Sequence, residues 1–183
     1  MKLSEVKTLI SGATVEECTF PVAGIEFIKF SEENGVAVAI AKDCVFDSDL
    51  GKNNNFSESN ALKRLNNEIL PKLEAEVGAE NIKEFELDLT SFDGLDTYGI
   101  ITTKIGIPTM DFYRANVRLF DKCKIDCYWW LATPDTTPEH LNDRWALCVS
   151  PRGGIYDGVI YYGYFGVRPF LHFVSSISVS CED

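Results

Sequence analysis

Cysteine and histidine are the residues of this sequence that could support nucleophilic, redox or metal chemistry. Cys123 and Cys127 are four positions apart, which on a helix would place two thiols together as half of a zinc site. Tetrahedral zinc needs four ligands, and neither His140 nor His172 has another histidine or a cysteine three or four positions away. We therefore interpret the cysteines as two ordinary thiols near the end of a helix.

The sequence contains no catalytic constellation. His140 follows Pro138 in a polar stretch, and His172 alternates with apolar neighbours, which predicts a half-buried, hydrogen-bonded imidazole on a strand. Gly-x-Ser-x-Gly and a glycine-rich phosphate loop are both absent. We predict that the chain is not an enzyme and assign no catalytic residue.

A calcium loop is the one candidate metal site. Asp47, Asp49 and Glu58 stand at positions 1, 3 and 12 of a calcium-loop pattern, and all three supply carboxylate oxygens. Gly51 occupies position 5, where a further oxygen ligand belongs. The alternative is a solvated loop whose carboxylates cap a helix, and no other cofactor is indicated.

Aromatic residues are concentrated in the second half of the chain. Adjacent residues of a strand face opposite sides, so at least one of Trp129 and Trp130 belongs to the core, and Trp145 is in step with apolar neighbours. Tyr, Asp and Arg side chains on a rigid strand-and-turn platform suit sugar stacking or a protein hot spot. The predicted ligand-binding residues are Arg152, Tyr156, Asp157, Tyr161, Tyr162 and Tyr164. The alternative is that these aromatic rings fill a small β core.

Hydrophobic spacing predicts the elements that position these residues. Helices are expected over 3–10, from a cap at Ser57 and, after a cap at Thr109, over 110–120. Pro71 either kinks the second helix or begins another that ends at Gly78. A hairpin is expected around Asn34-Gly35. Further strands are predicted over 84–89, 98–104, 127–132, 145–149, 155–160 and 168–174.

Composition predicts a folded α+β protein of one domain, residues 1–183. Hydrophobic residues make up 45% and charged residues 25% of the chain, as in globular proteins. Residues 1–100 hold 19 acidic and 9 basic residues, whereas 101–183 hold 9 and 8. An acidic chain without a basic stripe argues against nucleic acid and membrane surfaces as partners. The N-terminus has no signal-peptide pattern, so we expect synthesis in the cytoplasm and reduced cysteines.

A series of short motifs resembles the DUF6273 family of bacterial and phage proteins. In order these are Ala41-Lys42-Asp43, Asn53-Asn54-Asn55, the segment Leu62 to Glu68, Pro108-Thr109, Trp129 to Pro134 and Gly166-Val167-Arg168-Pro169. The resemblance covers residues 24–174, leaving 1–23 as a helical lead-in and 175–183 as a tail. That family is similar to the C-type-lectin-like fold of formylglycine-generating enzymes and phage receptor-binding proteins.

The resemblance implies a C-type-lectin-like fold in which Arg168 is buried and structural. Formylglycine-generating enzymes carry two closely spaced catalytic cysteines before the closing motif, whereas here Cys148 stands alone. We therefore expect a non-enzymatic recognition module of phage, prophage or bacterial origin that binds a glycan or protein. The alternative is a virion-associated assembly protein that uses the aromatic face to form a homo-oligomer, and an oxidase is the least favoured reading.

Overall fold

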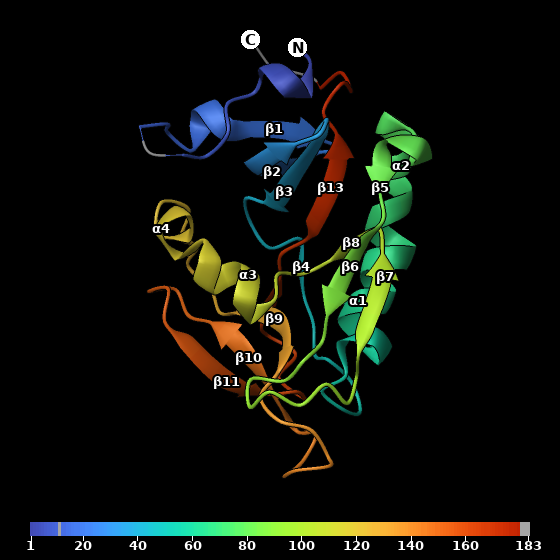
Figure 1. The fold of residues 1–183 in the computed structure, drawn as a ribbon, viewed down its shortest axis with the longest axis vertical. Helices are drawn as coiled ribbons and strands as arrows, with labels where there is room; N and C mark the ends of the chain where they lie inside the picture. Colours follow the sequence, from blue (N-terminus) through green and yellow to red (C-terminus); the bar gives the residue numbers. More distant parts are fainter. Residues whose placement is uncertain (11, 180–183) are drawn as a thin grey trace.

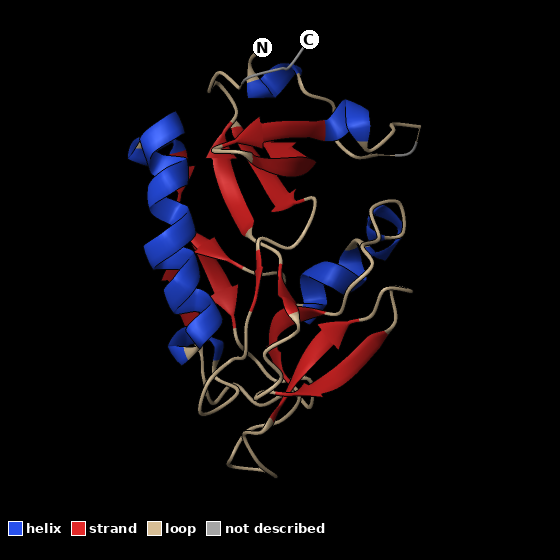
Figure 2. Ribbon diagram, turned by 180° about the vertical axis from the view of Figure 1, so that it is seen from behind, coloured by secondary structure: helices blue, strands red, loops and turns tan. Residues whose placement is uncertain are grey.

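The computed structural model describes residues 1–10 and 12–179 and shows a mixed α+β fold (Figure 1). Its strands form two larger sheets and one separate hairpin, and nearly all neighbouring strands are antiparallel. A long helical segment runs along one side of the molecule, as seen from behind in Figure 2. None of the helices in the described ranges combines the length and apolar character needed to cross a membrane.

The first sheet contains the predicted hairpin. Asn34 and Gly35 turn the chain with φ of 51° and 76°, which is the left-handed geometry of a tight two-residue turn. Along the sheet the order is β1 (Thr19–Val22), β2 (Ile25–Glu33), β3 (Val36–Ala41), β13 (Phe170–Val174) and β5 (Ile82–Lys83), with β8 (Ile105–Gly106) also paired to β13.

The second sheet carries the aromatic C-terminal segment. Its order is β11 (Ile155–Val159), β10 (Trp145–Val149), β9 (Trp129–Pro134), β12 (Gly166–Val167) and β4 (Phe46–Asp47). The turn between β10 and β11 contains Gly153 with φ of 83°, a left-handed conformation that glycine adopts readily. Both Trp129 and Trp130 are buried, because α3 (Met110–Ala115) and α4 (Val117–Phe120) cover one face of β9 and Phe165 covers the other.

The helix that contains Pro71 is continuous but changes its pitch. It runs through α1 (Asn60–Arg64), a π-helical turn (Leu65–Ile69) and α2 (Leu70–Val77), and it ends at Gly78. Leu70 N–H donates to the carbonyl of Leu65, five residues back. Because the proline lacks an N–H and its ring crowds the preceding turn, the wider turn accommodates it without breaking the helix. The cap is Ser59, whose hydroxyl accepts from Leu62 N–H at 3.0 Å, and not the predicted Ser57.

The remaining elements connect the two sheets. The predicted strands over 84–89 and 98–104 form the hairpin β6 (Phe85–Asp88) and β7 (Ile100–Thr103). The helix predicted over 110–120 is divided at Asn116 into α3 (Met110–Ala115) and α4 (Val117–Phe120), and Thr109 caps it as expected. Short 3₁₀ turns occur at Leu3–Glu5, Glu16–Cys18, Phe56–Glu58 and Ala79–Asn81.

The N-terminal segment differs from the helix predicted over 3–10. Within this range only Leu3–Glu5 form a helical turn, of the 3₁₀ type. A lysine of the first sheet, and not a series of helical hydrogen bonds, holds the segment in place. Lys29 is 1% exposed, and its ammonium donates to the carbonyls of Leu3 (3.1 Å) and Val6 (2.9 Å) and pairs with Glu32. A buried ammonium requires acceptors, so it fixes this segment against the sheet.

Arg168 lies where the chain passes from β12 in the second sheet to β13 in the first. It is 1% exposed, and its guanidinium donates to the carbonyls of Ala41 (2.6 Å) and Cys123 (3.3 Å). The guanidinium carbon also lies 5.4 Å from the Trp129 ring centroid and 5.8 Å from that of Phe120. The burial implied for this arginine is observed, and the side chain joins β3, the end of α4 and β9.

Replacing Arg168 with methionine is expected to destabilise the fold by about 3 kcal/mol, since two hydrogen bonds from a charged donor contribute roughly 1.5 kcal/mol each. The free energy of unfolding in urea is the measurement. Arg118→Met, at an exposed position of α4, is the matched control and is expected to change stability by less than about 0.5 kcal/mol. A loss of under about 1 kcal/mol for Arg168→Met would contradict the structural role.

Candidate functional site

Four exposed tyrosines gather around Phe165 at one face of the second sheet. We call Tyr128, Tyr156, Tyr162 and Tyr164 the tyrosine patch. Tyr128 stacks on Phe165 with ring centroids 5.3 Å apart, and Tyr162 stacks on Tyr164 at 5.1 Å. The exposed fraction of the four residues runs from 38% to 63%, whereas Phe165 beneath them is 6% exposed. The patch therefore presents connected aromatic rings on a buried aromatic support.

The structure brings together three of the six residues predicted to bind a ligand. Tyr156, Tyr162 and Tyr164 belong to the tyrosine patch. Asp157 is exposed on the opposite face of β11, because neighbouring strand residues alternate. The others do not join the patch either: Arg152 lies in the β10–β11 turn, and no aromatic pair among the described residues includes Tyr161.

Tyr128 is a patch residue that the sequence reasoning missed. It precedes β9, two positions before Trp130, and both rings pack against Phe165. Strand alternation from Trp130 would have placed Tyr128 on this face. Packing beneath the patch also explains Gly158, where a Cβ atom would lie 2.5 Å from the Phe165 ring and 2.9 Å from that of Trp130.

The three tryptophans predicted to be structural differ in burial. Trp129 is 2% exposed, and Trp130 is fully buried with its indole N–H donating to the Ser48 carbonyl at 2.7 Å. Trp145 is half-buried at the start of β10, so its position is less internal than the core role predicted for it. Its carbonyl accepts from the side chain of Asn54, which is 1% exposed.

The predicted calcium loop does not assemble. Asp49 accepts a hydrogen bond from Asn60 at 2.7 Å, whereas Glu58 accepts one from Asn53 at 2.9 Å. Leu50, between the predicted ligands, is buried and anchored to the carbonyl of Ile160, so the segment does not coil around a cation. Across residues 1–10 and 12–179 no group of three His, Cys, Asp or Glu side chains could hold a metal. The prediction that Asp47, Asp49 and Glu58 form a calcium site is therefore wrong, because Asp47 ends β4, Glu58 belongs to a 3₁₀ turn and Asp49 is bonded to Asn60.

A polar cleft lies beside the tyrosine patch. It has a volume of about 340 Å³, and Gly163, between Tyr162 and Tyr164 in the sequence, forms part of its wall. Carboxylate, amide and basic side chains line the rest, among them Asp47, Asp49, Asn60, Lys63 and Arg64. The cleft thus offers both hydrogen-bond donors and acceptors next to the stacked rings.

The two cysteines closest in space are not the two closest in sequence. Cys44 and Cys127 have their Sγ atoms 3.4 Å apart, while the Cys123 thiol donates to the carbonyl of Leu119. The half-site considered for Cys123 and Cys127 is therefore not formed. Burial raises the pKa of both Cys44 and Cys127, which keeps them as thiols at neutral pH.

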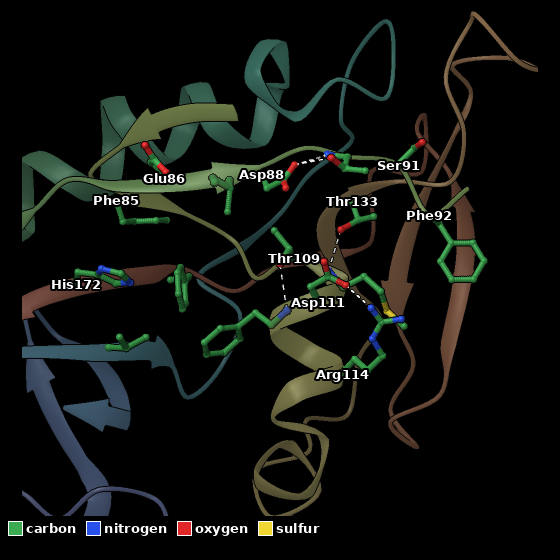
Figure 3. A pocket seen from close by; sticks show the side chains of 16 residues that line it. Phe85, Glu86, Asp88, Ser91, Phe92, Thr109, Asp111, Arg114, Thr133 and His172 are labelled. Atoms are coloured by element: carbon green, nitrogen blue, oxygen red, sulfur yellow. Dashed lines mark hydrogen bonds and ion pairs between the residues drawn. The ribbon is translucent and has the colours of Figure 1, made fainter. Parts of the chain in front are cut away.

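A mostly apolar pocket lies between β6 and α3, next to β3 and β13, and we call it the β6–α3 pocket (Figure 3). It has a volume of about 450 Å³. Phe85 projects from β6, Phe170 and His172 come from β13, and Phe112 comes from α3. The sequence did not reveal this site, because its residues come from five separated segments.

The loop at the rim of this pocket is fixed by Asp93. Its carboxylate accepts hydrogen bonds from Ser91, Thr136 and His140, and these bonds lower the pKa of Asp93 to about 2. The interaction joins the β6–β7 loop to the β9–β10 loop. The rim residues Ser91 and Phe92 are therefore held in place relative to the second sheet.

The chain matches no family model, and no curated protein or solved structure matches it.

Oxidation is expected to join Cys44 to Cys127. With diamide, two S–H bonds break and one S–S bond forms, and the two protons and two electrons reduce the diazene to a hydrazine. Mass spectrometry of a tryptic digest should show the cross-linked peptides, and Cys44→Ser should abolish them. Cys123→Ser is the control that should leave them unchanged. A cross-link from Cys123 in the wild type would contradict the observed pairing.

His172 is expected to make folding stability depend on pH below neutrality. Burial lowers the pKa of His172, so the unfolded chain binds a proton more readily than the folded one. Stability is therefore complete above the unfolded pKa of about 6.5 and is lost as pH falls from there through the folded pKa. Between pH 7 and 5.5 the melting temperature should fall less for His172→Gln than for the wild type. His140→Gln, which changes the other histidine, is the control, and equal falls for His172→Gln and the wild type would contradict this prediction.

Proposed function

We propose that the chain is a non-enzymatic recognition module that binds a glycan or a protein through the tyrosine patch. The observation that carries the proposal is the cluster of four exposed tyrosines, which contact one another in two pairs and are connected through the buried ring of Phe165. Tyrosine rings give a large contact area at a low cost in side-chain entropy, and they stack on flat apolar faces while their hydroxyls hydrogen-bond. Such clusters are unusual where no ligand has to be bound.

The polar cleft beside the patch favours a glycan as the ligand. Sugars present an apolar ring face together with many hydroxyl groups, so they need an aromatic platform with donors and acceptors beside it. Tyr162 and Tyr164 flank Gly163, which also lines the cleft with Asp49 and Lys63. A sugar stacked on Tyr164 would have its hydroxyls within reach of these groups.

The proposed scaffold is a C-type-lectin-like fold of the DUF6273 type. The order of motifs from Ala41-Lys42-Asp43 to Gly166-Val167-Arg168-Pro169 supports this proposal, as does a two-sheet arrangement closed through a buried arginine. Such scaffolds carry many functions, so the function rests on the site and not on the fold. A phage, prophage or bacterial origin belongs to the same proposal.

Glycan-array and host-cell binding by the purified chain test this function. The double variant Tyr156→Ala/Tyr162→Ala is expected to lose at least about tenfold in affinity, as truncation of aromatic hot spots does. Tyr161→Ala removes a tyrosine that is 61% exposed but makes no ring contact with the patch in the described residues, and it should bind like the wild type.

Equal loss in Tyr161→Ala and the double variant, or no binding to any glycan or host surface, would contradict the proposal. Sedimentation of the same proteins tests the assembly alternative. A stable oligomer that dissociates in the double variant would assign the patch to self-association, whereas a monomeric wild type would exclude that role.

A further inference from the structure

The β6–α3 pocket has the size and shape of a small-molecule site that is separate from the tyrosine patch. Its volume of about 450 Å³ falls within the usual range for ligand pockets of roughly 300–1,000 Å³. The pocket is lined by both apolar and polar side chains (Figure 3). It shares no residue with the patch or the polar cleft.

Aromatic side chains form the apolar part of the pocket. Phe85 stacks on the His172 ring at 4.5 Å between centroids and meets Phe170 edge-on at 5.1 Å. Phe112 in turn contacts Phe170 at 4.8 Å. Aromatic rings pack best against other flat rings in offset or edge-to-face geometry, so this surface selects a planar aromatic group.

Two of the amide groups in the first turn of α3 are already hydrogen-bonded to side chains. Met110 N–H donates to the buried hydroxyl of Thr133 at 2.8 Å, and Phe112 N–H donates to Thr109 at 3.2 Å. The helix end that borders the pocket therefore offers neither of these donors to an anion.

The charges around the mouth favour a cation. Arg114 is paired to Asp111 at 2.5 Å, whereas Glu86 and Asp88, which both line the pocket, form no ion pair within the described ranges. Lys83, beside His172 on the sheet, donates to the carbonyl of Glu80.

Asp88 is the carboxylate of the pocket lining that hydrogen bonds from a neighbouring residue hold in place. Thr90 donates two hydrogen bonds to Oδ1, at 2.9 and 2.7 Å, and these hold the carboxylate in place. Oδ2 accepts no hydrogen bond within the described ranges. A protonated amine bound there would add a charge-assisted hydrogen bond and would lie near rings that attract cations.

We propose that the β6–α3 pocket binds a small molecule made of a planar aromatic ring and a protonated amine. The ring packs on Phe85, Phe112 and Phe170, and the ammonium group donates to Asp88. The imidazole of His172, which makes no hydrogen bond within residues 1–10 and 12–179, completes the polar contacts.

Tryptamine and indole-3-acetate are the matched probes, because they share a ring and carry opposite charges. In ¹H–¹⁵N NMR titrations of the full chain up to about 10 mM, tryptamine should shift the amides of Phe85, Asp88 and His172, as expected for a weak ligand of this size. Indole-3-acetate should bind at least about tenfold more weakly. Asp88→Asn should weaken tryptamine binding about fivefold, the effect of losing one partly exposed charge pair.

Val38→Phe tests the location of the site. Val38 is half-buried on β3, directly opposite His172 in the sheet register, so a larger ring there fills the cavity without entering the core. Tryptamine binding should be lost while Tyr156→Ala/Tyr162→Ala retains it, and circular dichroism confirms folding of each variant. If Val38→Phe does not fold, the amide shifts of the wild type locate the site. Equal binding of both probes, shifts outside the pocket or no shift at all would overturn the proposal.

Discussion

The buried guanidinium of Arg168 is the interaction on which the arrangement of the two sheets depends. The chain leaves the second sheet after β12 and enters the first at β13, and this arginine bonds both to the end of β3 and to the segment after α4. Gly166 and Pro169, in the same four-residue motif, are also explained by packing and strand pairing. A Cβ atom at Gly166 would lie 2.2 Å from the sulfur of Cys44, and Pro169, which cannot donate to a strand ladder, separates β12 from β13 while its carbonyl accepts from Ala41.

This connection explains how the tyrosine patch and the β6–α3 pocket arise from one chain. The arginine joins the first sheet to the second. One face of β13, which carries Phe170 and His172, then forms the floor of a pocket whose sides are β6 and α3. The second sheet buries Trp129 towards the helices and Trp130 towards Phe165. Phe165 is buried against Trp130, and the tyrosines packed around Phe165 lie outside it at the surface.

Much of the fold could be predicted from local pattern, whereas sites assembled from distant segments could not. The Asn34-Gly35 hairpin and the cap at Thr109 depend on adjacent residues, and both are observed. The helix expected near the N-terminus does not form. Lys29 donates hydrogen bonds to the carbonyls of Leu3 and Val6, and the apolar residues of the segment pack on the sheet. Spacing suggested Cys123 and Cys127 as partners, but Cys127 lies against Cys44, 83 positions away.

Charge and aromaticity, which the sequence divides between its two halves, meet in the folded protein. The β6–α3 pocket takes Phe85 and Asp88 from the acidic half and Phe112, Phe170 and His172 from the aromatic half. The tyrosine patch likewise borders a cleft whose polar side chains come from residues 47–64. Each surface therefore combines aromatic and polar side chains from both halves of the sequence. The carboxylates proposed to contact a ligand, Asp88 in the pocket and Asp49 in the cleft, come from the acidic half of the chain and not from the aromatic half.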